Sequence, residues 1–288
     1  MDRADARVLW GAAVSAGGVR LEKGPVVAFF DVDGTLVCRD PVTGPGSFPT
    51  ERVACAVEDF AERGGIPILS TGRARVGIDQ LLNNLPFRGY VSLDGAHVVL
   101  DGKVILDRCF PRDVLERMVA EMLRVGMPAF FEGTELCLEL NASGGSLYNW
   151  GPVACDLEEM RMAKPDLRFA KVDFVDEAYG AYRASNFLME ELGYYNVGEG
   201  SHELVMPGVS KGAGARALLA ELSAAVGAVP ARVFAFGDSE NDLPLFEAAD
   251  VAVAMGQAAP HVREAADYVA LSCADDGVAE AMEHLGLI

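Results

Sequence analysis

The run VVAFFDVDGTLV, residues 26–37, constrains the fold more than any other segment of this chain. Its first five residues are apolar, a pattern typical of a strand buried on both faces of a parallel sheet. Asp31 and Asp33 follow where that strand should end. The carboxyl ends of strands form the ligand crevice of open α/β sheets, so we expect both carboxylates there. Carboxylates beside an apolar strand are often neutralised by a divalent cation, although Asp-Gly also occurs in ordinary turns.

Later segments alternate between helical and strand patterns. Thr50 is a suitable N-cap for a helix through Phe60, and residues 66–69 read as the next strand. Residues 213–226 repeat the helical pattern, and two further strands are expected at the positions 233–236 and 251–254. Strands and helices in alternation predict a doubly wound α/β fold with a parallel sheet.

Composition excludes several classes of partner. The 288 residues are 51% hydrophobic, and 24 basic against 43 acidic side chains give a net charge of −19. This charge argues against a nucleic-acid or anionic-membrane surface. An apolar stretch at residues 8–19 is shorter than a bilayer requires, and residues 1–23 are expected to be an added strand, a docked extension or a loose tail. Six cysteines without a C-x-x-C pair predict reduced thiols in a cytoplasmic protein.

Four segments in order carry a family resemblance. DVDGTL at residues 31–36 is followed by ILSTGR, by GVSKGAGARALL, and by FAFGDSENDLPLFEAAD with VAVAMGQA. Together they resemble the motifs of the haloacid dehalogenase-like (HAD) phosphatases, and the last resembles the Cof-type, sugar-phosphatase branch. The resemblance implies a Rossmann-like α/β core with an inserted, smaller α+β cap of type IIB. It also implies a phosphatase that hydrolyses small phosphate monoesters, with Mg²⁺ as cofactor.

The resemblance assigns the catalytic and metal-binding carboxylates. Asp31 is expected to attack phosphorus and form an aspartyl phosphate, while Asp33 protonates the leaving group and then activates water. Mg²⁺ is expected on the side chains of Asp31 and Asp238 and the main-chain oxygen of Asp33, all of them hard oxygen donors. Asp242 is expected to support this metal shell.

The resemblance also assigns phosphate ligands around these carboxylates. They are Thr71, Gly72, Arg73, Lys211 and Asn241. Ser70 competes with Thr71 for the hydroxyl role, and Thr71 is favoured because it directly precedes Gly72 and Arg73 as in the family. Arg73 either steers the substrate or forms a structural ion pair. The family commonly has Asn-Gly-Ala where this chain has Asp94, Gly95 and Ala96, a change that could affect the hinge or the leaving-group contacts.

The middle of the chain has a different hydrophobic pattern from the segments on either side. Residues 114–123 carry apolar residues at helical spacing, and a second helix is expected at 177–192. In residues 136–140 apolar and other side chains alternate, as in a strand of a sheet with one solvent-exposed face. We therefore expect a core at 1–107, with 1–23 as an N-terminal extension, an inserted cap at 108–200, and the rest of the core at 201–288.

The composition of the expected cap bears on the substrate. Residues 108–199 contain nine basic and sixteen acidic side chains, which gives −7 and no arginine cluster suited to a second phosphate. Four aromatic residues could stack on a sugar face, although core packing explains most of them: Phe130, Phe131, Tyr148 and Trp150. The expected substrates are hexose, pentose or similar polyol monophosphates, in preference to bisphosphates and nucleoside triphosphates.

Other functions remain as alternatives to hydrolysis. A phosphomutase with a related core would pass the phosphoryl group to a second sugar hydroxyl, and a noncatalytic protein would only bind a phosphate ligand. A two-component receiver domain also places Asp, Thr and Lys around a parallel sheet, but it is shorter and lacks GDSEND. We expect a monomer or weak homodimer whose partner is a small phosphate monoester.

Overall fold

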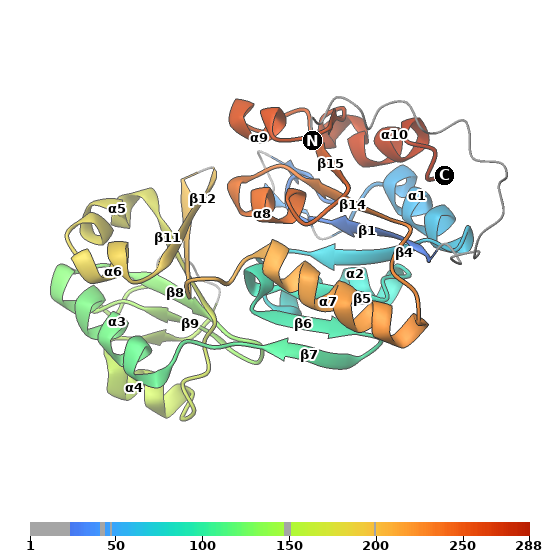
Figure 1. The fold of residues 1–288 in the computed structure, drawn as a ribbon. Coiled ribbons are helices and arrows are strands. Elements are labelled where there is room, and N and C mark those ends of the chain that lie inside the picture. Colours follow the sequence, from blue (N-terminus) through green and yellow to red (C-terminus); the bar gives the residue numbers. More distant parts are fainter. Residues whose placement is uncertain (1–23, 41–43, 47, 147–150, 199) are drawn as a thin grey trace, which may run out of the picture.

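Two sheets organise the chain, which is described here by a computed structural model covering residues 24–288 except 41–43, 47, 147–150 and 199. The larger sheet has eight strands in the order β16-β15-β14-β1-β4-β5-β6-β7, and the smaller has six in the order β10-β9-β8-β11-β13-β12. Figure 1 shows them as two units joined by two crossings of the chain. The expected α/β core with a second, α+β unit is confirmed. The predictions for residues 1–23 lie outside the described residues.

The larger sheet is parallel except at one edge. Its strands are β1 (Val26–Phe30), β4 (Ile66–Ser70), β5 (Gly89–Ser92), β6 (His97–Leu100), β7 (Lys103–Asp107), β14 (Arg232–Gly237), β15 (Val251–Ala254) and β16 (Tyr268–Val269). From β16 to β5 each neighbouring pair is parallel, while β5, β6 and β7 form an antiparallel edge. The predicted strands at 26–30, 66–69, 233–236 and 251–254 are confirmed within one residue at each end.

Helices cover both faces of this sheet, as a doubly wound fold requires. They are α1 (Glu51–Glu62), α2 (Asp79–Asn84), α7 (Lys211–Val226), α8 (Leu243–Phe246), α9 (Pro260–Glu264) and α10 (Gly277–His284), with short 3₁₀ turns η2 (Arg75–Ile78), η3 (Leu93–Gly95), η4 (Glu240–Asp242) and η5 (Cys273–Asp275). Phe30 and Phe60 belong to one apolar cluster with α1 and α10. Phe29 and Leu218 belong to the cluster on the opposite face with α7. Alternate residues of β1 therefore supply both cores.

The predicted helix start at Thr50 is confirmed. Thr50 has extended backbone dihedrals, and its hydroxyl accepts a hydrogen bond from the Val53 amide at 3.3 Å. Such a cap satisfies one of the free N–H groups of a first helical turn and contributes about 1 kcal/mol. Val53, Val57 and Phe60 are buried on one face of α1, which holds the helix against the sheet.

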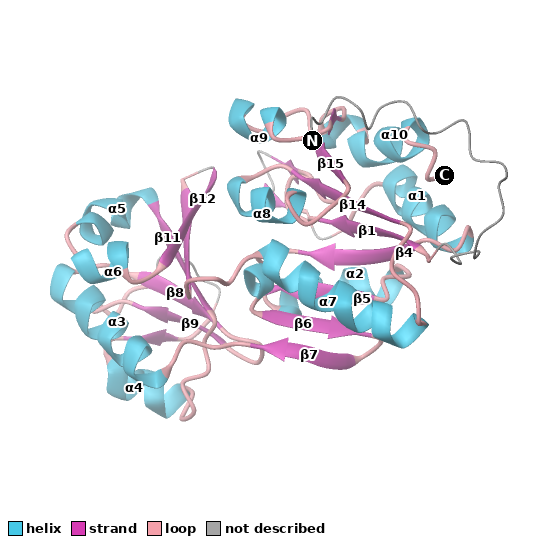
Figure 2. Ribbon diagram, in the orientation of Figure 1, coloured by secondary structure: helices cyan, strands magenta, loops and turns pink. Residues whose placement is uncertain are grey.

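The smaller sheet is mixed and is covered by helices on one face. It contains β8 (Ala129–Glu132), β9 (Cys137–Leu140), β10 (Val153–Ala154), β11 (Lys171–Val175), β12 (Gly193–Gly198) and β13 (Ser201–Val205). Its helices are α3 (Arg112–Val125), α4 (Leu157–Ala163), α5 (Asp176–Arg183) and α6 (Asn186–Glu190). Figure 2 shows these helices on the side away from the larger sheet. The other face is therefore turned toward the larger sheet, where Ala170 and Val205 pack in one cluster with Leu93 and Ala96.

Two expectations for the second unit differ from the structure. The helix expected at 177–192 is two helices, α5 and α6, because Ser185 leaves helical geometry and its hydroxyl caps α6 at the Leu188 amide. The core was expected to resume at residue 201, but β13 pairs antiparallel with β11 and β12 in the smaller sheet. We therefore propose that the chain returns to the core between Val205 and Lys211.

The expectation of six reduced cysteines is wrong for two of them. Cys38 and Cys273 form a disulfide with a Cα–Cα distance of 5.6 Å across 235 residues of sequence. Four cysteines are free: Cys55, Cys109, Cys137 and Cys155. The disulfide joins the turn after β1 to η5, close to a short hairpin of β2 (Arg39–Asp40) and β3 (Gly44–Pro45). Within the described part of the chain, no helix is long and apolar enough to cross a membrane.

Candidate active site

Strand pairing brings two of the predicted aspartates together. Phe30 at the end of β1 pairs with Phe236 in parallel β14, and the Asp31 amide donates to the Phe236 carbonyl at 3.0 Å. Since parallel strands in register end at the same edge, Asp31 and Asp238 leave the sheet side by side. Figure 1 shows the carboxyl ends of β1 and β4 directed toward the smaller sheet.

Asp31, Asp238 and Asp242 form an acidic centre. One carboxylate oxygen from each lies within 4.8 Å of the others. Burial, and then the charge of Asp242, raise the pKa of Asp238 to about 7. Burial is also the main cause that raises the pKa of Asp31 well above its ordinary value, against the lowering effect of Lys211. The centre therefore concentrates more negative charge than its protein surroundings neutralise.

Lys211 supplies the positive charge inside this centre. Its ammonium donates to Asp31 at 2.6 Å and to Asp242 at 2.7 Å, and its side chain is 1% exposed. Burial alone would lower the pKa of Lys211, but the charges of Asp242 and Asp31 raise it. The helix α7 begins at Lys211 because the Ser210 hydroxyl caps the Ala213 amide. This cap fixes the place where the lysine leaves the backbone.

The acidic centre fits a hard divalent cation. Its donors are carboxylate oxygens, which Mg²⁺ prefers, and one of them, Asp238 Oδ1, is buried without a hydrogen-bond partner. The loop after β1 packs closely on it: a side chain at Gly34, which has φ +82°, would overlap the Asp238 carboxylate. The expected magnesium site is therefore compatible with these residues.

Asp33 lies outside the acidic centre in this structure. Its carboxylate accepts from Arg73 Nε at 2.7 Å and from Arg73 Nη2 at 2.5 Å. The side chain of Asp33 is 51% exposed, whereas that of Asp31 is 5% exposed. Arg73 therefore forms an ion pair, which was one of its two expected roles. Its partner in this pair, Asp33, is the carboxylate predicted to act as acid and base.

The loop after β4 carries the predicted hydroxyl and glycine. Thr71 is buried, and its hydroxyl accepts from the Arg73 amide at 3.1 Å. The competing Ser70 hydroxyl is buried without a hydrogen-bond partner. Gly72 lies against the smaller sheet, since a Cβ on it would be 2.8 Å from Glu203 and 3.2 Å from Lys171. Gly72 thus lies next to a polar junction between the two sheets.

Asn241 joins the acidic centre to that junction. Its side-chain amide donates to Asp94 at 2.9 Å and to Glu203 at 3.2 Å. Asp94 adopts left-handed backbone dihedrals in η3, φ 53° and ψ 32°, a conformation that aspartate and asparagine tolerate better than most residues. Burial, and then the charge of Glu203, raise the pKa of Asp94 to about 8. Asp94 therefore places a buried acidic group at this junction, at the position where the resemblance led us to expect asparagine.

The structure adds residues that sequence reasoning missed. The Lys171 cluster consists of Lys171, Glu132, Asp173, Glu203 and Asp94. Polar residues at alternate positions of residues 171–175 and 201–205 were an available signal, because alternation places them on one face of a strand. Gln257 was also missed: its side chain donates to the Gly34 carbonyl at 2.5 Å and accepts from the Cys273 amide at 2.9 Å.

The centre is almost closed to solvent. As whole residues, Asp31 and Asn241 are each 4% exposed, and Thr71 is 1% exposed. The smaller unit takes part in this closure, since Glu203 accepts from Asn241 at 3.2 Å and borders Gly72.

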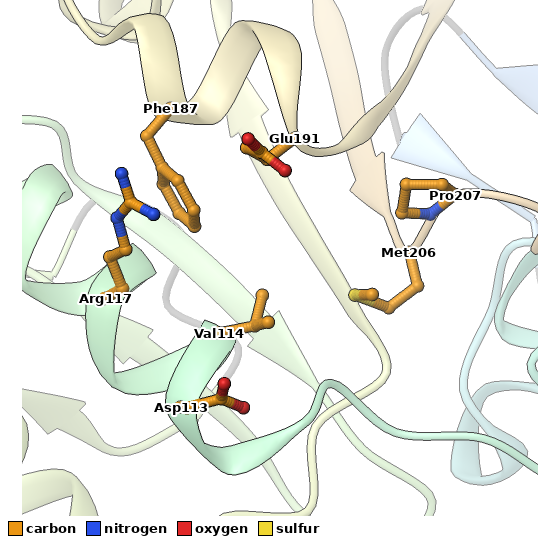
Figure 3. A pocket seen from close by; sticks show the side chains of 7 residues that line it. All are labelled: Asp113, Val114, Arg117, Phe187, Glu191, Met206 and Pro207. Atoms are coloured by element: carbon orange, nitrogen blue, oxygen red, sulfur yellow. The ribbon is translucent and has the colours of Figure 1, made fainter.

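A separate pocket lies on the smaller unit, away from these residues. Figure 3 shows it between α3, α6 and the chain after β13. The central guanidinium carbon of Arg117 lies 4.1 Å from the centre of the Phe187 ring. Its volume is about 260 Å³, and none of the predicted site residues lines it. Two of the aromatics considered for sugar stacking, Phe130 and Phe131, are buried elsewhere in this unit. Tyr148 and Trp150 lie outside the described residues.

Comparison with known proteins now identifies the family. A family model described as haloacid dehalogenase-like hydrolase matches residues 28–282, so the chain belongs to this family. The predictions of the family, of the α/β fold with a second sheet, and of the enzyme class as a HAD-type phosphatase are therefore confirmed.

Two relatives that cover most of this chain are less than 30% identical to it. The chain is 29% identical to a putative bifunctional phosphatase/peptidyl-prolyl cis-trans isomerase of Streptococcus pyogenes, covering 91% of this chain but only 54% of that protein. It is 27% identical to the putative phosphatase YkrA of Bacillus subtilis, over 90% of this chain and 97% of YkrA. The solved structure of the HAD subclass IIB sugar phosphatase BT4131 superimposes with a TM-score of 0.73 at 22% identity, covering 92% and 100% of the two chains.

Proposed function

We propose that this protein hydrolyses small phosphate monoesters, in particular sugar phosphates, with Mg²⁺ and through a phosphorylated Asp31. The observation that carries the proposal is the buried group of Asp31, Asp238, Asp242 and Lys211 at the carboxyl edge of the larger sheet. A nucleophilic carboxylate, a cation site and a point charge for phosphate oxygens are the parts that phosphoryl transfer requires.

The first chemical step belongs to Asp31. A carboxylate oxygen of Asp31 forms a bond to phosphorus while the bond from phosphorus to the ester oxygen breaks. Lys211 is hydrogen-bonded to Asp31 and offers its positive charge to the phosphoryl oxygens. The other proposed phosphate ligands, Asn241, Gly72 and Thr71, border the space that the phosphoryl group would occupy. A bound Mg²⁺ would neutralise phosphoryl charge, and the residues suited to hold it are Asp31, Asp238 and Asp242, with the main-chain oxygen of Asp33.

Asp33 supplies the proton transfers. In its acid form it protonates the leaving alkoxide, and as a carboxylate it then takes a proton from the water that attacks the aspartyl phosphate. That attack releases inorganic phosphate and restores Asp31. Because Arg73 holds Asp33 in the closed structure, this role requires that Asp33 turn from the ion pair toward the substrate.

Two observations support a sugar or polyol leaving group. Residues 108–199 carry a formal −7 without an arginine cluster, which disfavours a second phosphate. The similar structure BT4131 is a sugar phosphatase.

Phosphate release tests the proposal directly. A panel of sugar monophosphates, bisphosphates and nucleoside triphosphates is incubated with Mg²⁺ or with EDTA, using the wild type and Asp31→Asn. We expect inorganic phosphate from sugar monophosphates with Mg²⁺ only, and loss of turnover by several powers of ten in the variant. Isomerised sugar phosphate without release would identify a mutase, and binding without any turnover would identify a noncatalytic protein.

A further inference from the structure

The Lys171 cluster is a buried group with an excess of acidic residues. Lys171 is 3% exposed, and its ammonium lies 2.9 Å from Glu132, 2.9 Å from Glu203, 3.1 Å from Asp173 and 3.8 Å from Asp94. One cation therefore faces four carboxyl groups. A buried charge is expensive unless it is paired, so an arrangement with surplus carboxyl groups is unusual for a purely structural cluster.

The cluster is built on the face of the smaller sheet that is turned toward the core. Glu132 on β8 pairs with Lys171 on β11, and Asp173 pairs with Glu203 on β13. The intervening residues, Val172 and Phe174, point to the opposite face and belong to its apolar core. Because side chains alternate along a β-strand, the polar residues of the neighbouring strands β8, β11 and β13 all lie on this face of the sheet.

The cluster directly adjoins the proposed phosphate ligands. Asn241 donates to both Asp94 and Glu203, at 2.9 and 3.2 Å. A Cβ on Gly72 would be 2.8 Å from Glu203, 3.2 Å from Lys171 and 3.3 Å from Asp94. A phosphate bound beside Asn241 and Gly72 would therefore have these carboxyl groups as neighbours.

Two acceptors in the cluster have no hydrogen-bond partner: Asp94 Oδ2, and Asp173 Oδ1, which forms only an ion pair with Lys171 at 3.1 Å. Asp94 is 0% exposed, and its Oδ2 atom is unpaired; the nearest cation, Lys171 Nζ, lies at 3.8 Å, beyond hydrogen-bond distance. Burial is the main cause that raises the pKa of both Asp94 and Asp173. Because carboxyl groups outnumber the nearby cations in this buried cluster, a donor or a cation entering it would be favoured.

We propose that the Lys171 cluster is the leaving-group subsite of this phosphatase and selects hydroxyl-bearing or ammonium-bearing leaving groups over those carrying a carboxylate or a second phosphate. Hydroxyl and ammonium groups supply a donor to the unpaired Asp94 Oδ2 atom, whereas an anion is repelled by the carboxylates of Glu132 and Glu203, which face a single lysine. The inference rests on the proposed function, because it takes Asn241 and Gly72 as neighbours of the phosphate.

The test compares phosphate esters that differ only in their terminal group. Phosphoglycolate, hydroxyethyl phosphate and phosphoethanolamine present a carboxylate, a hydroxyl and an ammonium on a two-carbon chain. The phosphates of gluconate, sorbitol and aminosorbitol form the same series on six carbons. The measurements are kcat/KM for the wild type with Mg²⁺, and calorimetric binding to Asp31→Asn, which needs no turnover.

We expect the hydroxyl and ammonium members to exceed the carboxylate member by at least about tenfold in both measurements, in the series that binds better. Glu203→Gln, which removes a charge, and Asp94→Asn, which replaces an acceptor by an amide donor, should each shift the ratio of anionic to neutral ester toward the anion by about threefold or more. Glu135→Gln is the matched control, since it removes a carboxylate paired with Lys164 on the exposed side of the same unit and should leave the ratio unchanged.

Each outcome decides between the two proposals. Equal or better binding of the carboxylate member overturns the inference, as does an equal change for all three members in both Asp94→Asn and Glu203→Gln. The wild-type comparison stands even if a variant fails to fold. Loss of turnover on every ester, with the binding order retained, would contradict the proposed function and leave the subsite assignment supported.

Discussion

Arg73 holds Asp33 through two parallel hydrogen bonds, of 2.7 Å from Nε and 2.5 Å from Nη2. The same guanidinium donates to the Gly77 carbonyl at 3.0 Å and to the Gly46 carbonyl at 3.3 Å. Arg73 thus connects the proposed acid and base to two loops at the rim of the site. A planar guanidinium suits this fork, and lysine does not reproduce it.

We predict that Arg73→Ala and Arg73→Lys lower kcat about tenfold to a hundredfold for esters with poor leaving groups, because Asp33 is no longer kept within one side-chain rotation of the substrate. The loss should be much smaller for p-nitrophenyl phosphate, whose leaving group needs no protonation. Steady-state kinetics on both ester types checks this. Arg88→Ala removes another arginine–aspartate fork, with Asp101 on the surface, and serves as control. An equal loss on both ester types would contradict a role through Asp33.

The acidic centre predicts a specific pattern of metal binding. Asp238→Asn should weaken Mg²⁺ binding at least about tenfold, since it removes a direct oxygen donor. Calorimetric titration of Mg²⁺ into metal-free protein measures this without reference to turnover. Asp59→Asn, an exposed carboxylate on α1, is the control. Unchanged Mg²⁺ affinity in Asp238→Asn would place the metal elsewhere.

Asp94 predicts a dependence of stability on pH. Its pKa is about 8 in the folded protein against 3.8 for an ordinary aspartate, so the folded state holds a proton that the unfolded state releases between these values. The stabilisation from this proton is complete below about pH 4 and is lost as pH rises through about 8. Asp94→Asn removes this dependence, and its free energy of unfolding should fall less steeply than that of the wild type from pH 5 to pH 9.

Urea denaturation in EDTA at several pH values measures the difference. Asp101→Asn, an exposed carboxylate, should follow the wild-type curve. Parallel curves for the wild type and Asp94→Asn would show that Asp94 does not carry the proton.

Much of this arrangement follows from local sequence patterns. Asp31 and Asp238 were predictable because each follows an apolar strand, and parallel strands in register end together. The cluster around Lys171 was not, because Lys171 and Glu203 are separated by 32 residues and meet only when β11 pairs with β13. The Cys38–Cys273 pair spans 235 residues and has no local signature. Local periodicity reports which face a residue lies on, but not which residue it meets there.

The disulfide predicts a stability difference. Replacing Cys38 and Cys273 together by serine should lower the free energy of unfolding by about 2–5 kcal/mol, since the bond restricts the unfolded chain. Denaturation with and without a thiol reductant checks this, and peptide mapping without reduction should recover the linked peptides. Replacement of Cys55, which is free and exposed, should have little effect. Equal stability of the double variant and the oxidised wild type would contradict the disulfide.

The central claim is that Asp31 accepts the phosphoryl group of the substrate, and trapping that group tests it most directly. In Asp33→Asn, p-nitrophenyl phosphate should still phosphorylate Asp31, because its leaving group needs no acid, while water attack is slowed by loss of the base. Acid quenching followed by peptide mass spectrometry should then find one phosphoryl group on the peptide that contains Asp31. A peptide without that group, together with continued phosphate release by Asp31→Asn, would contradict the account.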